Sequence, residues 1–559
     1  MNAGSDAVPA QRDLDRRIAI VLLLLAFCYL LLTHWTALHG QLVSDSLSLM
    51  RGCHARAEEG TLLAWLLQLW LDGLPVHSHY YRPLSSASLC LDYLLFADNA
   101  MAWHSMQLAL HAGNGLLLFA LAGLLSRGLR WRQSASALAV VLFFVSPAAP
   151  EVSVWIAGRY NVLALGWMLL AMLLHGHGRY HWSVLMTLLA LASKESALVL
   201  PVLLASISWW RYALHDAPPP SLAARLRQSW LELWPTAVLV LAYLALRWHL
   251  FGDPLSVYAK STSMADDFGW HWLQRVPVLL EILLPGWRDA PALQWLFVLS
   301  LTLAAGFGLW RLLFLRTAQQ SIWIRTWLLP ALWLSLALLA LLPHVQTASS
   351  AGEGSRLMYN AGAWLALLLA LPMAHADKAG LGKPLFGSPT VSAALHLGIS
   401  MVVLLVLACS QYPAQRDWSQ ATVLVDKLRT ELALKAAAMP PDHWALVLVP
   451  DHLGMALVAR NAQGALVMPP LQQKTLLPQL LPFLYRDMKS WYQRLQQGER
   501  SWPQYAFCTH PHSGALMPLA LPDAAVSLVD WEAFWRDVMA SPPCHGIDML
   551  RLPEPSTRS

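Results

Sequence analysis

Apolar residues in this chain are gathered into blocks of about twenty, the length that an α-helix needs to cross the hydrocarbon core of a bilayer. Hydrophobic residues make up 57% of the 559 residues and charged residues only 13%, far below the charged share of a typical soluble domain. Backbone polar groups inside lipid must be hydrogen-bonded within the segment, so such blocks fold as helices. We therefore expect a mainly α, polytopic transmembrane helix bundle embedded in a lipid bilayer.

The hydropathy pattern predicts about eleven spans. They lie at residues 18–38, 103–125, 134–150, 160–175, 181–193, 195–210, 230–250, 292–315, 326–343, 357–373 and 391–410. The run 181–210 is alternatively one long tilted helix, and 272–286 is interpreted as a re-entrant or interfacial helix because Pro277 and Pro285 break it.

Basic residues fall in every loop that this span count places on one side of the membrane. They are Arg127, Arg130, Arg132, Arg179, Arg211, Arg225, Arg227, Arg316, Arg325, Lys378 and Lys383. The positive-inside rule assigns that side to the cytoplasm. Residues 1–17 are then a cytoplasmic N-terminus, and the loop 39–102 is periplasmic. The expected location is a bacterial inner membrane.

The composition changes near residue 411, where apolar blocks give way to mixed sequence. We expect a transmembrane domain over 18–410 and a small α/β periplasmic C-terminal domain over 411–559. Strands are predicted at 443–450, 455–460 and 465–468, and helices at 411–438, 475–497 and 531–539. Cys508 and Cys544 lie in this domain, and a disulfide between them suits an oxidising compartment, with two free thiols as the alternative.

Two classes of partner receive little support from the sequence. No run of Lys and Arg has the length typical of a nucleic-acid site, so no nucleic acid is expected. The six Cys residues show no zinc-finger spacing. His175, His177 and His181 lie together on the cytoplasmic side, and we interpret them as interfacial, with zinc binding as the alternative. The metal requirement stays unassigned, a divalent ion being one option.

Chemistry-bearing residues begin in the first periplasmic loop. Asp45 follows the first span among apolar and small residues, and a partly buried carboxylate there is a candidate general base. A helix N-cap is the alternative for Asp45. Arg82, in a segment stiffened by Pro83, is a candidate ligand for a phosphate, or else a cation at headgroup level.

Polar side chains also occur within the second span. His104 and His111 are seven residues apart and share one helical face, and Asn114 lies close to it. Such residues normally point into the bundle, where they either line a functional cavity or form hydrogen bonds between helices.

Further ionisable residues meet at the same predicted face. Glu151 and Arg159 flank a proline-rich interruption after the third span, and Lys194 and Glu195 sit between two apolar stretches with almost no loop. A Lys–Glu pair in that position is costly unless it is paired or functional, although a tight turn in water is the alternative. Arg356 and Tyr359 add a cation and a phenol at the start of the tenth span.

The order of these segments resembles the GT-C superfamily of membrane glycosyltransferases. It is most similar to the bacterial relatives of the protein O-mannosyltransferases and of the tetratricopeptide-bearing transmembrane O-mannosyltransferases. The matching segments are Tyr81-Arg-Pro-Leu84, His104 with His111 and Asn114, Pro147 with Glu151 to Trp155 and Gly158-Arg159, Ser193-Lys-Glu195, and Arg356 with Tyr359. Asp45 is followed by Ser46, where relatives often have a second acid.

The resemblance implies an inverting glycosyltransferase that uses a polyprenyl-phosphate-linked sugar donor and an unidentified acceptor. It implies that Asp45 is the catalytic carboxylate and that Arg82, Arg159, Lys194 and Arg356 bind the donor phosphate. His104, His111, Asn114, Glu151, Glu195 and Tyr359 would then line the cavity. A transporter or flippase of lipid-linked saccharide and a non-catalytic membrane scaffold are the alternatives.

Overall fold

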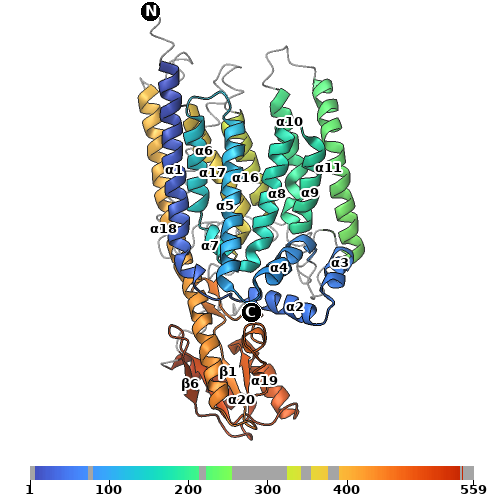
Figure 1. Cartoon of the computed structure of the whole chain (residues 1–559), viewed down its shortest axis with the longest axis vertical. Coiled ribbons are helices and arrows are strands. Elements are labelled where there is room, and N and C mark those ends of the chain that lie inside the picture. Colours follow the sequence, from blue (N-terminus) through green and yellow to red (C-terminus); the bar gives the residue numbers. More distant parts are fainter. Residues whose placement is uncertain are drawn as a thin grey trace, which may run out of the picture.

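The computed structural model describes residues 7–72, 80–212, 222–252, 254, 324–341, 354–375, 389–541 and 544. Figure 1 shows a bundle of long helices with a small mixed domain below it. α1 (Ala7–Leu38) begins at the end of the bundle far from this domain, and the helices α2 (Asp45–Glu58), α3 (Leu62–Asp72) and α4 (Pro83–Phe96) lie across the near end. The predicted mainly helical architecture with a small α/β region is confirmed.

The helices of the bundle run back and forth between its two ends. They are α1 (Ala7–Leu38), α5 (Ala100–Leu125), α6 (Arg132–Phe144), α7 (Ala149–Ser153), α8 (Arg159–Gly176), α9 (Tyr180–Ser193), α10 (Leu200–Tyr212), α11 (Leu222–Phe251), α16 (Leu329–Leu341), α17 (Tyr359–Ala370) and the first part of α18 (Pro389–Ala438). Short 3₁₀ turns lead into three of them, at Ile156–Gly158, Glu195–Val199 and Ser355–Met358.

Five of the described helical segments are long and apolar enough to cross a membrane. They are Gln11–Leu38, Ala100–Leu125, Ile156–Gly176, Leu226–Phe251 and Ser355–Ala374. Large apolar side chains such as Leu25, Leu32 and Leu241 are more than half exposed on the bundle surface, as lipid-facing residues are. The predicted span at 292–315 and the predicted re-entrant helix at 272–286 lie outside the described residues.

The run 181–210 forms two elements, as the two-span interpretation predicts. α9 ends at Ser193, Lys194 is extended with φ −164° and ψ 144°, and the chain turns through Glu195–Val199 into α10. The extended residue reverses the chain direction with almost no loop. It thereby brings two charged side chains to the end of the bundle nearest the small domain.

The loop between α1 and α5 is itself helical. It contains α2 (Asp45–Glu58), α3 (Leu62–Asp72) and α4 (Pro83–Phe96). A disulfide between Cys53 and Cys90, which was not predicted from the sequence, joins α2 to α4. This loop therefore forms a cross-linked cap over one end of the bundle.

The small domain is built on a four-stranded sheet with the order β4-β1-β5-β6. Its strands are β1 (Ala445–Leu448), β4 (Leu480–Phe483), β5 (Tyr505–Thr509) and β6 (Leu516–Leu519), and a separate hairpin is formed by β2 (His452–Leu453) and β3 (Ala456–Leu457). β1 is parallel to β4 and to β5, whereas β6 is antiparallel to β5.

Both faces of the central strand are buried. Ala445 and Val447 share a hydrophobic cluster with α18, while Leu446 and Leu448 pack with Trp531 and Trp535 of α20 (Leu528–Ala540) on the other face. This alternation is the two-residue period of a strand. The sheet is therefore covered by α18 on one face and by α20 on the other.

Two expectations for this domain are wrong. The helix predicted at 475–497 is present only as α19 (Met488–Gln496), because Leu480–Phe483 pair with β1 as an edge strand, a position that tolerates Pro482. The strand predicted at 465–468 is a 3₁₀ turn at Ala465–Val467. The helix predicted at 531–539 is present within α20.

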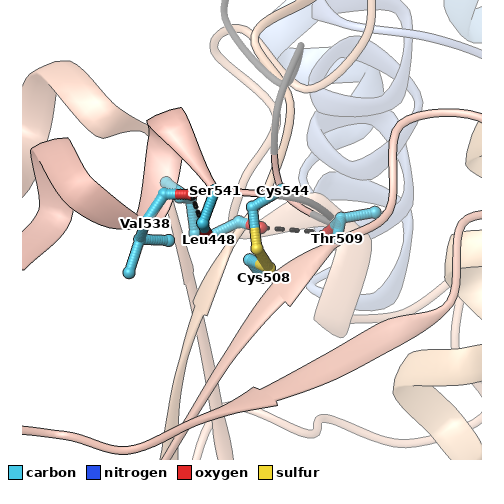
Figure 2. Close-up of a disulfide and its surroundings, with 6 residues drawn as sticks. All are labelled: Leu448, Cys508, Thr509, Val538, Ser541 and Cys544. Carbon is cyan, nitrogen blue, oxygen red and sulfur yellow. Dashed lines mark hydrogen bonds between the residues drawn. A yellow bond between two sulfur atoms is a disulfide. The ribbon is translucent and has the colours of Figure 1, made fainter.

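The second disulfide closes the end of the small domain. Figure 2 shows Cys508 of β5 joined to Cys544, which follows α20. Beside it, the Thr509 hydroxyl donates to the Leu448 carbonyl oxygen at 3.0 Å. The bridge attaches Cys544 to β5, and the hydrogen bond joins β5 to its neighbour β1.

Candidate functional site

Charged residues from four separate segments meet at the end of the bundle nearest the small domain. Lys194 interacts electrostatically with Glu195, Arg82, Arg356 and Glu151. These residues come from the α9–α10 turn, the residue before α4, the 3₁₀ turn before α17, and α7. The group contains three cations and two carboxylates, and it lies where the apolar bundle meets the helical loop.

Arg82 and Glu195 form the first pair of this group. Two nearly parallel hydrogen bonds run from Arg82 Nη2 to Glu195 Oε1 at 2.7 Å and from Arg82 Nε to Glu195 Oε2 at 3.2 Å. The guanidinium also lies over the rings of Tyr80 and Tyr160, 4.1 and 5.0 Å from their centroids. Burial alone would lower the pKa of Arg82, but the carboxylate of Glu195 outweighs it and raises the pKa above its usual value.

Glu151 organises the turn that precedes α17. Its buried carboxylate accepts hydrogen bonds from the backbone N–H of Gly354 and of Arg356, from the Ser355 hydroxyl at 2.7 Å, and from the Arg356 guanidinium. Gly354 has a φ of 107°, a conformation that glycine adopts at little cost. The side chain of Arg356 stays 19% exposed, and its guanidinium carbon lies 5.1 Å from the centroid of the Trp155 ring.

Lys194 differs from the two arginines in its direct partner. Its ammonium donates to the side-chain carbonyl of Asn161, a neutral group, on the first turn of α8. The side chain is nevertheless buried, at 8% exposure for the residue. A buried ammonium favours the approach of an anion, because charge–charge attraction is stronger away from water.

Asp45 is the first residue of α2 and is half-buried. The N-cap position belongs to Ser44, so Asp45 does not occupy the capping position that the sequence offered as its alternative. The charges of Asp45 and Arg82 both act on the hydroxyl of Tyr160. Tyr160 is therefore a neighbour that the candidate base and the Arg82–Glu195 pair share.

Arg159 belongs to a different, fully buried pair. Its guanidinium donates to Asp92 Oδ2 at 2.6 Å, to Gln107 Oε1 at 2.6 Å and to the Ser88 hydroxyl at 3.1 Å, and its side chain has no exposed surface. This arrangement favours a structural role, in which Arg159 joins α4, α5 and α8. We therefore leave Arg159 out of the proposed donor site.

The polar residues of the second span are also internal. His111 Nδ1 lies 2.7 Å from the Tyr359 hydroxyl, which accepts a further hydrogen bond from Asn114 at 3.2 Å. The rings of Phe143 and Phe144 pack against His111, and His104 is only 2% exposed. For His111 and Asn114 this geometry favours hydrogen bonds between helices, the alternative that the sequence left open.

The described part of the chain contains no group of three or more His, Cys, Asp or Glu side chains that could hold a metal ion. On the opposite face of the bundle, His175 Nε2 lies 2.7 Å from the Ser208 hydroxyl and 3.8 Å from Glu232. His175 is therefore engaged with neighbouring helices in this structure.

Three neighbours of the predicted site residues were not recognised from the sequence. Asp92, which binds Arg159, was not singled out, although an acid within the apolar run of α4 is a signal for a buried partner. Tyr160 and Gln107 gave no signal, because a tyrosine or glutamine in a span is unremarkable until its neighbours are known.

No protein-family model and no curated protein matches this chain. Among solved structures, it is similar to the Archaeoglobus fulgidus oligosaccharyltransferase tethered to an acceptor peptide, with 10% identity and a TM-score of 0.37 over 80% of this chain and 64% of that one. A second structure, of AglB from the same organism with an inhibitory peptide and a dolichol-phosphate, has 12% identity, a TM-score of 0.36 and the same two coverages of 80% and 64%.

The mycobacterial arabinofuranosyltransferase AftD aligns over 89% of this chain and 35% of its own, with 16% identity and a TM-score of 0.43. This chain thus spans less than two thirds of the length of each of these three proteins. At such TM-scores the likenesses carry no weight for activity, so a function has to be argued from the residues of this chain.

Proposed function

We propose that this chain is an inverting membrane glycosyltransferase that moves a sugar from a polyprenyl-phosphate donor to a lipid, glycan or protein acceptor. The observation that carries the proposal is the charged group around Lys194, in which three cations face two carboxylates at the end of an apolar bundle. A lipid-linked phosphate needs both parts of this arrangement, since its tail stays in lipid while cations bind its headgroup.

In the proposed reaction the acceptor hydroxyl transfers its proton to the carboxylate of Asp45. The hydroxyl oxygen attacks the anomeric carbon from the face opposite the phosphate, and the bond between that carbon and the phosphate oxygen breaks. The polyprenyl phosphate leaves with the electron pair of that bond, and its new negative charge is stabilised by Lys194, Arg82 and Arg356. The sugar is transferred with inversion, and the proton remains on Asp45 until it passes to water.

We place this chemistry on the periplasmic side of a bacterial inner membrane, with the N-terminus in the cytoplasm. Both disulfides support this orientation, because Cys53–Cys90 lies in the first loop and Cys508–Cys544 in the small domain, at the same end of the bundle. The basic residues Arg127, Arg130 and Arg179 lie in turns at the opposite end, as the positive-inside rule requires of a cytoplasmic face.

The test is sugar transfer by the purified chain in nanodiscs, with radiolabelled polyprenyl-phosphate sugars and a mixture of candidate acceptors. Asp45→Asn is compared with Asp98→Asn, which makes the same change at an exposed position of the same loop. We expect transfer by the wild type and by Asp98→Asn and at least a hundredfold loss in Asp45→Asn, the scale on which a general base contributes. Equal transfer by all three would remove Asp45 as the base, and no transfer by folded wild type would favour a transporter or a scaffold.

A further inference from the structure

Asp45 lies between two serines that are held by different parts of the molecule. Ser44 donates its backbone N–H to the Val458 carbonyl at 2.8 Å and its hydroxyl to the Arg460 carbonyl at 2.9 Å, both in the small domain. Ser46 accepts a hydrogen bond from the backbone N–H of Ala157 at 3.1 Å, in the bundle just before α8. The candidate base is therefore fixed from both sides.

The backbone of Ser44 is strained. Its φ of 50° and ψ of −138° lie in a region that glycine adopts freely and other residues adopt rarely. Such a conformation persists only where several contacts with the surrounding structure hold the backbone in it. Here Ser44 is held by the two hydrogen bonds that it donates to the carbonyls of Val458 and Arg460, so the direction in which the chain enters α2 depends on the small domain.

The contact around Ser44 is broad and mostly apolar. Leu42, Val43 and Leu47 are buried in the same hydrophobic cluster as Val458 and Leu466 of the small domain. The backbone N–H of Gln41 donates to the Thr422 carbonyl of α18 at 3.0 Å, and the hydroxyl of Ser48 donates to the Asn461 carbonyl. The first turn of α2 and the small domain therefore share one core.

We infer that Ser44 is a positioning residue through which the small domain sets the orientation of the Asp45 carboxylate. The inference rests on the proposed function, because it takes Asp45 as the base. It assigns the small domain a part in the chemistry without any of its side chains touching the reacting atoms. Displacement of the segment 458–461 would release Ser44 from its strained conformation and turn Asp45 away from the acceptor.

Gly454 offers a way to displace this segment without altering α2. It lies in the turn of the β2–β3 hairpin with a φ of 56°, and a Cβ there would lie 2.1 Å from Asp417 Oδ2 on α18. The same Asp417 oxygen accepts the backbone N–H of Met455 at 3.1 Å. Gly454→Ala should therefore displace the Asp417 carboxylate, break its hydrogen bond with Met455, and so loosen the attachment of the hairpin and of the segment after it to α18.

Gly498 provides the matched control in the same domain. Its φ is 74°, so alanine is strained there too, but a Cβ would meet no atom within 4 Å. We would measure hydrogen–deuterium exchange of the full chain in nanodiscs for the amides of residues 42–48. We expect about tenfold faster exchange in Gly454→Ala and no change in Gly498→Ala. Unchanged exchange in Gly454→Ala, or an equal change in both variants, would overturn the inference.

Kinetics of sugar transfer give a second test of the positioning role of Ser44. Ser44→Val is expected to lower kcat by about tenfold or more with an unchanged KM for the donor, because a β-branched residue cannot hold a positive φ. Ser44→Gly, which adopts that φ freely, should keep most of the wild-type rate. Equal rates for Ser44→Val and Ser44→Gly would contradict a positioning role. Absence of transfer in the wild type would refute the proposed function, while the exchange result would still decide whether the small domain holds Ser44.

Discussion

The guanidinium of Arg82 and the carboxylate of Glu195 meet through two hydrogen bonds although 113 residues separate them in sequence. The pair joins the loop between α1 and α5 to the α9–α10 turn, and its side chains are only 12% and 14% exposed. It thus serves both the packing of the loop on the bundle and the charge balance around Lys194.

Removal of one partner from this pair should destabilise the protein. Glu195→Gln leaves a largely buried guanidinium without its counter-charge, and such changes typically cost about 3–5 kcal/mol. Thermal unfolding in detergent, followed by tryptophan fluorescence, measures the loss. Arg56→Ala is the control, because it breaks an exposed ion pair with Glu59 in the same loop and should cost about 1 kcal/mol or less. Equal losses of stability in the two variants would show that the buried pair stabilises the protein no more than an exposed ion pair does.

Lys194 and Arg159 should respond in opposite ways to replacement by methionine. Lys194→Met removes a buried cation whose direct partner is neutral, so we expect nearly unchanged thermal stability and about tenfold weaker binding of farnesyl phosphate. Arg159→Met leaves Asp92 buried without its partner, so we expect a clear loss of stability.

Isothermal titration with farnesyl phosphate and thermal unfolding, both in detergent, separate these two effects. Lys474→Met, at an exposed position of the small domain, controls for the loss of a positive charge alone. Binding that is as tight in Lys194→Met as in Lys474→Met would remove Lys194 from the donor site.

The number of cysteines that can be alkylated should depend on whether the protein is first reduced. The chain has six cysteines, of which Cys53–Cys90 and Cys508–Cys544 are bridged while Cys28 and Cys409 are free and exposed. Denaturation and alkylation without reductant should therefore add two labels per chain, and reduction beforehand should add six. Intact mass spectrometry counts them, with Cys28→Ser expected to lower each number by one. Four or six labels without reduction would contradict the bridges.

Acid should weaken the small domain through Asp451. Burial alone would raise the pKa of this carboxyl, but hydrogen bonds from His452 and Arg460, together with their charges, outweigh it and lower the pKa below its ordinary value. The unfolded state then binds the proton more readily than the folded state, so the stabilisation is complete above about pH 4 and is lost as the pH falls towards the folded pKa.

Thermal unfolding of the full chain between pH 7 and pH 3 tests this dependence. Asp451→Asn should be less stable than the wild type at pH 7 and should lose less stability on acidification. Asp523→Asn, at an exposed position of the same domain, should retain the wild-type profile. An identical profile for Asp451→Asn and the wild type would assign the acid sensitivity elsewhere.

Ionisable residues within apolar sequence were the part of the site that could be predicted. Lys194, Glu195 and Arg356 stand out because lipid penalises such groups unless they are paired or functional. Their partners could not be predicted, since Glu151 and Arg356 are 205 residues apart and no sequence period links them. For the same reason Arg159 was assigned to the donor, whereas its partner Asp92 favours a structural role.

The helical bundle could be predicted from hydropathy, but its junction with the small domain could not. A change of composition near residue 411 indicated a boundary, and the structure has the single helix α18 through that point, with Pro413 inside it. The change in composition therefore marks the point at which α18 leaves the apolar bundle and enters more polar surroundings, not the end of the helix. Similarly, propensity favoured a helix at 475–497, and the pairing of Leu480–Phe483 with β1 overrode it.

The continuity of α18 fixes the distance between the bundle and the small domain. Its 50 residues correspond to a rod of about 75 Å, which passes from the bundle to the sheet of the small domain without a flexible joint. A tether would tolerate changes of length, but one residue inserted into a helix turns everything beyond it by about 100°. Natural variation in the length of this segment should therefore be confined to whole turns, because the facing of the small domain relative to the bundle depends on the residue count of α18 as well as on the contact with the first turn of α2.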